Sequence, residues 1–301
     1  MKIFVIIVTY NGEKWIEKCI TSLINSSIQL EIIVLDNLST DNTINIIEDN
    51  FSYITLIKFK KNIGFGKANN VGLKKAQREG ADYVFLLNQD AWVMPDTIEK
   101  LYKQMQLHPG YGILSPIHLN GTETELDLNF SMYINPQSCP YLISDYIVSG
   151  KPRDEIYSVR FINAALWLIS KECLEKIGGF CPLFPHYGED VDYVFRLSYH
   201  KLKIGISPYA RGVHDRPQGT SKINKYQREK QHYASILVTL CNINYSFFHC
   251  SINSIQIVFK AMIKQEITLI YIKYWIKLLC IIPQIIKHRK IAKRNDAIYI
   301  T

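Results

Sequence analysis

The chain has 301 residues, of which 48% are hydrophobic and 21% charged, with 15 glycines and 11 prolines. This composition excludes a disordered, collagen-like or low-complexity protein, and the length suits one large α/β domain with an appendage or two domains. The seven cysteines form no C-x-x-C pair, so we expect neither a disulfide framework nor a zinc knuckle. The apolar run at the amino terminus is too short for a signal peptide, which favours a reducing cytoplasm as the compartment.

The net charge of +8 is concentrated near the end of the chain. Residues 222–301 hold 13 Lys and Arg against 3 Asp and Glu, whereas residues 1–221 hold 22 against 24. The basic part also contains long aliphatic runs, and the rest of the chain is slightly acidic. We therefore expect no nucleic-acid partner.

Residues 1–115 follow the pattern of buried strands alternating with helices. Helical spacing of apolar residues from Trp15 to Ile24 follows the first strand, and Asp41 is placed to cap a second helix. The series predicts an α/β fold with a mostly parallel central sheet flanked by helices. The runs that predict strands are short, rich in β-branched residues and do not alternate: Ile3–Val8, Ile32–Leu35, Ile54–Ile57 and Tyr83–Leu87.

The middle of the chain is less regular. Residues 116–160 are rich in Asn, Ser, Thr, Pro and Tyr without a sustained period, which predicts loops and irregular strands around a pocket. We then expect a strand at Phe161–Ser170, a helix at Lys171–Ile177 that ends at two glycines, and another helix at Val191–His200.

Residues 222–301 form a basic, aromatic-rich helical tail in this interpretation. The window Ile267–Ile286 has the length of a membrane span, but each central lysine costs about 2.5 to 3.5 kcal/mol on insertion. We expect an amphipathic helix on an anionic membrane surface instead, with a helical cap on the rest of the chain or a dimer interface as alternatives. A basic cluster follows this window: Lys287, Arg289, Lys290, Lys293 and Arg294.

Polar residues follow three of the predicted strands. They are Thr9-Tyr10-Asn11, Asp36-Asn37 and Asn88-Gln89-Asp90. Each group alone is typical of a turn, but ligands of an open parallel sheet bind beyond the carboxyl ends of its strands. Three successive strands that end in this way predict a binding site at this edge.

A glycine-rich segment, Gly64–Asn69, partly matches the dinucleotide-binding fingerprint. It lacks the last glycine and follows the third strand, so we exclude a Rossmann dehydrogenase. Its backbone amides, at the start of a helix, can still face a phosphate, and Lys67 could add charge there.

Five segments stand in a fixed order along residues 1–216. They are VTYNG (8–12), VLDNLSTDNT (34–43), NIGFGKANNVG (62–72), ADYVFLLNQD (81–90) and KIGGFCPLFPHYGEDVDYVFRL (176–197). Together they resemble the family 2 glycosyltransferases with the GT-A nucleotide-sugar fold, in particular rhamnosyltransferase-like bacterial enzymes. The resemblance implies a GT-A domain over residues 1–221, with a nucleotide-sugar-binding half (1–115) and an acceptor-binding half (116–221).

The resemblance also implies roles in donor binding. Thr9 and Tyr10 match residues that line the nucleotide base, and Asp36 matches the carboxylate that hydrogen-bonds it. The triplet from Asn88 to Asp90 stands where the family has its D-x-D motif, so Asn88 is expected near the ribose. Asp90 is expected to bind a divalent cation, Mn²⁺ or Mg²⁺, on the diphosphate. Asn88 replaces the first carboxylate of the motif, which lowers the charge available for the cation.

Further roles follow for residues in the second half. Glu189 and Asp190 match the family's E-D pair, in which the aspartate is the proposed catalytic base, and a carboxylate near the acceptor hydroxyl can take its proton during attack. His214 matches a position where some relatives place a histidine that completes the metal shell, although a lone histidine is often structural. His186 and Tyr187 are candidates for acceptor binding.

These observations predict an inverting glycosyltransferase of bacterial cell-surface polysaccharide synthesis. The expected donor is a UDP- or dTDP-sugar, and the expected acceptor is either a saccharide or a lipid-linked saccharide at the inner face of the plasma membrane. A catalytically silent nucleotide-sugar-binding or scaffold protein and a sugar-1-phosphate nucleotidyltransferase are the alternatives. The latter lacks a glycine-rich, basic signature after the first strand.

Overall fold

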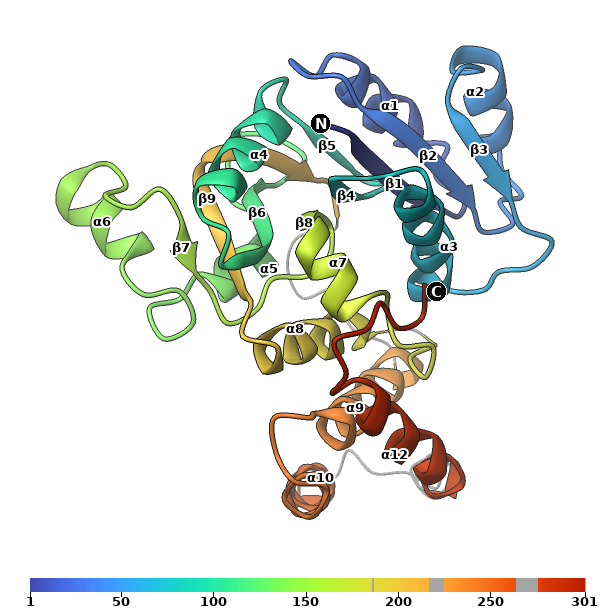
Figure 1. The fold of residues 1–301 in the computed structure, drawn as a ribbon, viewed down its shortest axis with the longest axis vertical. Coiled ribbons are helices and arrows are strands. Elements are labelled where there is room, and N and C mark those ends of the chain that lie inside the picture. The colour runs from blue at the N-terminus through green and yellow to red at the C-terminus, as the bar shows by residue number, and fades with distance from the viewer. Residues whose placement is uncertain (186, 217–224, 264–275, 301) are drawn as a thin grey trace.

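The computed structural model describes residues 1–185, 187–216, 225–263 and 276–300, and its strands form one sheet with helices on both faces (Figure 1). The order is β3-β2-β1-β4-β8-β6-β9-β5, and β7 pairs with β9. The strands are β1 (Ile3–Thr9), β2 (Glu31–Asp36), β3 (Thr55–Lys58), β4 (Tyr83–Asn88), β5 (Ala91–Val93), β6 (Tyr111–Leu119), β7 (Tyr157–Ser158), β8 (Leu166–Ser170) and β9 (Lys203–His214).

The first four strands are parallel and confirm the predicted α/β class. Alternate residues of β1 enter different layers, because successive side chains of a strand point to opposite faces. Val5 packs with α1 (Ile16–Ile24) and α4 (Thr97–Leu107), whereas Ile6 packs with α3 (Phe65–Arg78). Burial on both faces explains why these strands read as continuous apolar runs.

The predicted helices of this half are present with small shifts. In α1 the buried residues recur at the helical spacing that the sequence shows. In α2 (Thr43–Asn50) the helix begins two residues after Asp41, and the Asp41 carboxylate accepts a hydrogen bond from the Thr43 amide at 3.1 Å. Asp41 therefore stabilises the start of this helix, although Asn42 occupies the capping position.

The second half of the sheet is mixed. Strand β8 runs antiparallel to both β4 and β6, whereas β6 and β9 are parallel. The helix α7 (Lys171–Ile177) has the predicted bounds, and α8 (Glu189–Tyr199) begins two residues before the expected helix. Strands from residues 1–115 and from residues 116–221 join the same sheet.

Two predictions for the middle of the chain were wrong in extent. Strand β8 begins at Leu166, five residues later than expected, and the segment taken as irregular contains α5 (Leu128–Tyr133) and α6 (Leu142–Ser149). Both helices are too short to show a period, and α6 follows Tyr141, whose backbone is left-handed at φ 72°. Figure 1 shows α6 projecting away from the sheet.

The tail forms the end of the molecule next to α8 (Figure 1). Its described helices are α9 (Lys225–Cys241), α10 (Phe247–Ile263) and α12 (Ile282–Ile291). Apolar residues of α9 and α12, including Leu237 and Ile285, pack with Phe184 from the loop before α8. None of the described helices is long and apolar enough to cross a membrane.

The basic cluster of the tail divides into exposed and buried residues. Lys287, Lys290, Lys293 and Arg294 are exposed. Arg289 is buried, and its guanidinium donates to the backbone carbonyls of Leu240, Asn242 and Tyr245. The assignment of Arg289 to a membrane-facing cluster was therefore wrong, because its guanidinium N–H groups already donate hydrogen bonds to carbonyl oxygens inside the protein. The first part of the predicted surface helix, residues 267–275, lies outside the described residues.

Candidate active site

The carboxyl ends of β1 and β4 are joined by Gln89. Its amide oxygen accepts hydrogen bonds from the Thr9 hydroxyl at 2.7 Å and the Tyr10 amide at 2.8 Å, and its nitrogen donates to the Tyr10 carbonyl. Gly12 leaves room for this contact, since a Cβ there would lie 2.5 Å from Gln89 Oε1. The sequence analysis gave Gln89 no role of its own. The only feature that pointed to it was its place between Asn88 and Asp90, the two positions that match the motif.

A cavity of about 590 Å³ lies beyond these strand ends. Tyr10, Asn88 and Asp90, all predicted site residues, line it together with Val8, Asn37, Asn62, Gly64, Phe65, Gln89, Pro185 and Lys230. Lys230 comes from α9 in the tail and was not predicted. The cavity therefore combines the expected strand ends with one residue from a distant part of the chain.

Three residues predicted to bind the donor lie outside this lining. Thr9 is fully buried beneath it, where its hydroxyl holds Gln89. Asp36 is also buried, and its carboxylate accepts from the backbone amides of Leu38 and Ser39. Lys67 is exposed on α3.

Asp90 and His214 meet at the end of the sheet. Strand β5 pairs with β9 so that Ala91 opposes His214, and the Asp215 amide donates to the Asp90 carbonyl at 2.8 Å. His214 Nε2 lies 3.4 Å from Asp90 Oδ1. Two ligands on neighbouring positions of an octahedral Mg²⁺ or Mn²⁺ are about 3 Å apart, so this pair of oxygen and nitrogen atoms fits one divalent cation.

Behind His214, a buried group contains His118 and Asp127, whose ligand atoms lie within 4.8 Å of a His214 atom. His118 Nε2 is 2.8 Å from the Ser115 hydroxyl, and the Asp127 carboxylate is paired with Arg216. Because the Arg216 guanidinium already occupies Asp127, this group does not fit a second metal ion, and the His118 ring packs edge-on against the His214 ring with centroids 6.4 Å apart.

A second group of possible ligands contains Cys181, Asp192 and His288. The Asp192 carboxylate binds Arg196 at 2.9 Å on one oxygen and His288 at 2.8 Å on the other. Its charge is thus matched by protein cations, and the group does not fit a metal ion.

Asp190 is connected to the end of β4 through Ala164 and Ala165. Its carboxylate accepts from the backbone amides of Val191 and Ala164, while the next residue, Ala165, accepts from the Asn88 amide through its carbonyl at 3.0 Å. Two consecutive residues therefore connect the start of α8 with the end of β4. Gly188, at φ 91°, makes the turn that directs Glu189 and Asp190 inward.

The two acids of this pair differ in protonation. Burial, together with the neighbouring Asp190 charge, raises the pKa of Glu189 to about 8. Burial also raises the pKa of Asp190, but amide donors from Val191 and Ala164 oppose the shift and the value is about 6. Near pH 7 Glu189 is thus mostly neutral and Asp190 mostly ionised, so Asp190 is the stronger candidate for a base.

Of the residues predicted to bind the acceptor, His186 lies outside the described residues. Tyr187 is 38% exposed and adopts a left-handed backbone at φ 68°, which is uncommon for an aromatic residue. It directly precedes the Gly188 turn and presents its side chain on the protein surface.

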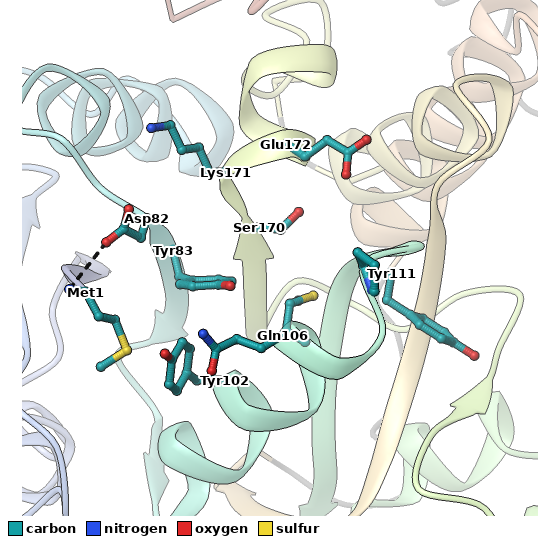
Figure 2. Close-up of a pocket in the computed structure, with 11 residues that line it drawn as sticks. Met1, Asp82, Tyr83, Tyr102, Gln106, Tyr111, Ser170, Lys171 and Glu172 are labelled. Carbon is teal, nitrogen blue, oxygen red and sulfur yellow. Dashed lines mark ion pairs between the residues drawn. The ribbon is translucent and has the colours of Figure 1, made fainter.

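Another cavity of about 540 Å³ lies at the opposite end of the strands (Figure 2). Figure 2 shows Asp82 and Tyr83 at the start of β4 and Ser170 at the end of β8, with the amino terminus of Met1 paired to Asp82 at 3.7 Å. None of the predicted site residues that the structure describes lines this cavity. It is therefore unrelated to the strand ends that carry the motifs.

Comparison with known proteins identifies the family. The family model described as glycosyl transferase family 2 matches residues 4–178, more than half of the chain. The chain belongs to this family. It is 38% identical over 88 residues to the dTDP-rhamnosyl transferase RfbG of Shigella flexneri, a match that covers 27% of this chain and 30% of the relative. The chain spans only 13 to 40% of the length of the first three curated relatives.

Solved structures of glycosyltransferases share the fold. Residues 1–349 of Staphylococcus aureus TarS superimpose with a TM-score of 0.61 at 19% identity, covering 97% of this chain and 81% of that one. The mannosyltransferase PcManGT of Pyrobaculum calidifontis, solved with GDP-Man and Mn²⁺, gives 0.58 at 16% identity and covers 99% and 84%. The protein therefore has the GT-A fold, as the sequence motifs predicted.

Proposed function

We propose that this glycosyltransferase moves a sugar from a UDP- or dTDP-linked donor to a saccharide acceptor with inversion at the anomeric carbon. The observation that carries the proposal is that Asp90, which lines the cavity, has His214 and Asp190 connected to its end of the sheet, although neither of these two residues is among the lining residues. Asp90 and His214 approach within 3.4 Å, and Asp190 is connected to β4 through Ala164 and Ala165. In this proposal residues 1–115 bind the donor and residues 116–221 bind the acceptor. Residues 222–301 form the basic helical tail.

The proposed reaction is a single displacement. Asp190 takes the proton of the acceptor hydroxyl as its oxygen attacks the anomeric carbon, and the bond from that carbon to the diphosphate oxygen breaks. The nucleoside diphosphate leaves with the electron pair of that bond, and the configuration at carbon inverts. Neutral Glu189 lies beside the base without adding a second negative charge.

Asp90 and His214 would hold the divalent cation. When bound, Mn²⁺ or Mg²⁺ offsets negative charge on the diphosphate. The His118 ring packs edge-on against the His214 ring, and the hydrogen bond from the Asp215 amide holds the backbone of Asp90 next to it. Tyr10, Asn37 and Asn88 are then available along the cavity wall for the nucleoside.

The donor class is supported by relatives that carry different nucleotides. RfbG is named a dTDP-rhamnosyl transferase, TarS has been solved with UDP-GlcNAc, and PcManGT with GDP-Man. A hexosyl- or rhamnosyltransferase is our proposal for this chain. TarS is named a poly(ribitol-phosphate) β-N-acetylglucosaminyltransferase, which supports a bacterial surface polymer as the acceptor.

We also propose that the tail lies on an anionic membrane at its cytoplasmic face, where a lipid-linked acceptor would be found. Four residues of α10 form one exposed apolar stripe at spacings of four, three and four: Phe248, Ile252, Ile255 and Phe259. Between Glu229 and Asp296 the sequence has a single acidic residue, Glu266. An apolar face in a basic segment suits the surface of anionic lipids.

Donor hydrolysis across UDP-, dTDP- and GDP-sugars, with Mn²⁺ or with EDTA, tests the enzymatic proposal. We expect one nucleotide class to be hydrolysed and the rate to fall with EDTA. The configuration of a product formed on an added saccharide, read by NMR, tests inversion. A protein that binds these donors but neither hydrolyses nor transfers them would support the silent alternative.

A further inference from the structure

The donor cavity includes a lysine from the tail. Lys230 lies in the second turn of α9 and lines the same cavity as Asn88, Gln89 and Asp90. It is 140 positions after Asp90 in the sequence, within a segment whose cations suggested a membrane surface. Because Lys230 lines the cavity, at least one cation of the tail is placed to bind a ligand there instead of a membrane surface.

The position of α9 is fixed by close packing against the loop that leads to the acid pair. A Cβ at Gly188 would lie 2.6 Å from Val238 of α9 and 3.1 Å from Phe184. Leu237 is fully buried in the same cluster. The helix that carries Lys230 is thus held next to the residue before Glu189.

The helix α12, later in the tail, anchors α9 a second time. Arg289 donates to the carbonyls of Leu240 and Asn242, at the end of α9, at 2.9 and 2.6 Å. The preceding residue, His288, binds Asp192 of α8 at 2.8 Å. Buried polar contacts of this kind tie α9 to α8, and so keep the backbone of Lys230 at the cavity.

The charges around the cavity indicate what Lys230 binds. Among the described lining residues, Asp90 is the only acid and Lys230 the only base. A nucleotide-sugar brings two negative charges and a divalent cation two positive ones, so Asp90 leaves the cavity lining with one excess negative charge. Lys230 cancels that charge. Cleavage of the sugar bond adds a further negative charge to the leaving group, where a nearby ammonium is most stabilising.

We propose that the Lys230 ammonium binds the diphosphate of the donor and stabilises the nucleoside diphosphate as it leaves. This inference rests on the proposed donor class and extends the active site into the tail. Lysine binds phosphates as a point charge, which suits a residue that lines the cavity from an anchored helix.

The test compares Lys230→Gln and Lys230→Arg with Arg228→Gln. Arg228 is an exposed cation two residues away on the same helix and does not line the cavity. Calorimetry would measure the binding of UDP, dTDP and GDP in Mn²⁺, and ligand-detected NMR the binding of the matching nucleoside. For Lys230→Gln we expect diphosphate affinity to fall about 10- to 100-fold with nucleoside binding unchanged. Lys230→Arg and Arg228→Gln should remain close to wild type.

The possible failures are distinguishable. Wild-type protein that binds none of the three diphosphates contradicts the proposed function, and this inference with it. Wild-type binding that Lys230→Gln leaves unchanged, or that Arg228→Gln weakens equally, overturns the role of Lys230 alone. Lys230→Met keeps the aliphatic stem and takes the place of Lys230→Gln if that variant has a lowered unfolding temperature.

Discussion

Asp190 and Glu189 are neighbours in sequence, yet their surroundings assign them different protonation states. Amide donors from Val191 and Ala164 stabilise the ionised form of Asp190, whereas Glu189 Oε2 is buried and has no hydrogen-bond partner in the described structure. An unpartnered carboxylate oxygen in the interior favours the protonated acid. The pair thus offers one base and one neutral neighbour near pH 7.

The pH dependence of transfer follows from this difference. We expect kcat/KM to rise with pH through about 6 as Asp190 loses its proton, and to approach a plateau above it. Initial rates between pH 4.5 and 8 measure the profile. A rate that stays constant through pH 6, with donor binding also constant, would contradict the assignment of Asp190 as the base.

Replacement of Asp190 separates catalysis from binding. Asp190→Asn should lower kcat about 100- to 10,000-fold, because proton removal acts in the transition state. Affinity for the nucleoside diphosphate should stay within about threefold, since the base contributes little to the ground state. Calorimetry and a transfer assay on the same preparation check both values; retained transfer would exclude Asp190 from the role.

Asp90 provides the prediction for the cation. Asp90→Ala should abolish the increase in diphosphate affinity that Mn²⁺ gives, because His214 alone offers one nitrogen ligand at this end of the sheet. Titration of the nucleotide in Mn²⁺ and in EDTA measures the difference. Asp82→Asn, at the far cavity, is the control and should keep the full metal effect.

The sequence singled out several residues that the structure brings to the ends of strands, but it did not single out the cavity-lining residue that comes from the tail. Asp90 and His214 follow from motif order, and β5–β9 pairing places them together. Lys230 could not be predicted, because its place depends on how α9 packs on a glycine far away in the chain. Gln89 was missed since an amide has no reactivity that would single it out.

At the scale of elements, α8 depends on a residue of the tail. Asp192 on α8 is buried between Arg196 and His288 of α12, and His288 Nδ1 contacts the Tyr299 hydroxyl at 2.6 Å. Burial opposes the charged form of His288, but Asp192, with a further hydrogen bond to Cys181, outweighs it and raises the pKa of His288 to about 9. The histidine is therefore charged in the folded protein at neutral pH.

This ion pair makes stability depend on pH. Because the pKa of His288 is raised by folding, its contribution is complete below about 6.5 and disappears as pH rises through about 9. Urea unfolding should show that His288→Gln costs about 3 kcal/mol near pH 6.5 and much less at pH 9.5. An equal cost at both values would show that His288 is not charged in the folded state.

The elements that the sequence predicted best are those with long apolar patterns. The four parallel strands and α1 lie within one or two residues of their expected bounds, because β1, β2 and β4 are mostly buried and α1 has a regular apolar face. Strand β8 is shorter than expected, since residues 163–165 turn toward Asn88 and Asp190 before the strand begins. Such a turn is set by tertiary contacts and leaves no periodic signal.

For the whole molecule, the membrane proposal depends on charges that remain on the surface. Exposed Lys287, Lys290, Lys293 and Arg294 are each worth about 1 kcal/mol near anionic lipid. Their joint replacement by glutamine should release the protein from phosphatidylglycerol vesicles in a flotation assay while donor hydrolysis continues. Phe259→Ser, in the exposed stripe of α10, should weaken binding without changing its salt dependence. Unchanged flotation of both variants would favour the cap or dimer alternative.

The contact between Asp192 and His288 joins residues 96 positions apart, which affects how the protein emerges from the ribosome. At about 5 to 20 residues per second, translation needs roughly 5 to 20 s to deliver His288 after Asp192. During that interval α8 has its aspartate and arginine but lacks the histidine, and the apolar side of the loop before it has no α9 or α12 to cover it. Until the last helix has been made, the nascent chain therefore leaves apolar residues of this loop, such as Phe184, without their α9 and α12 neighbours.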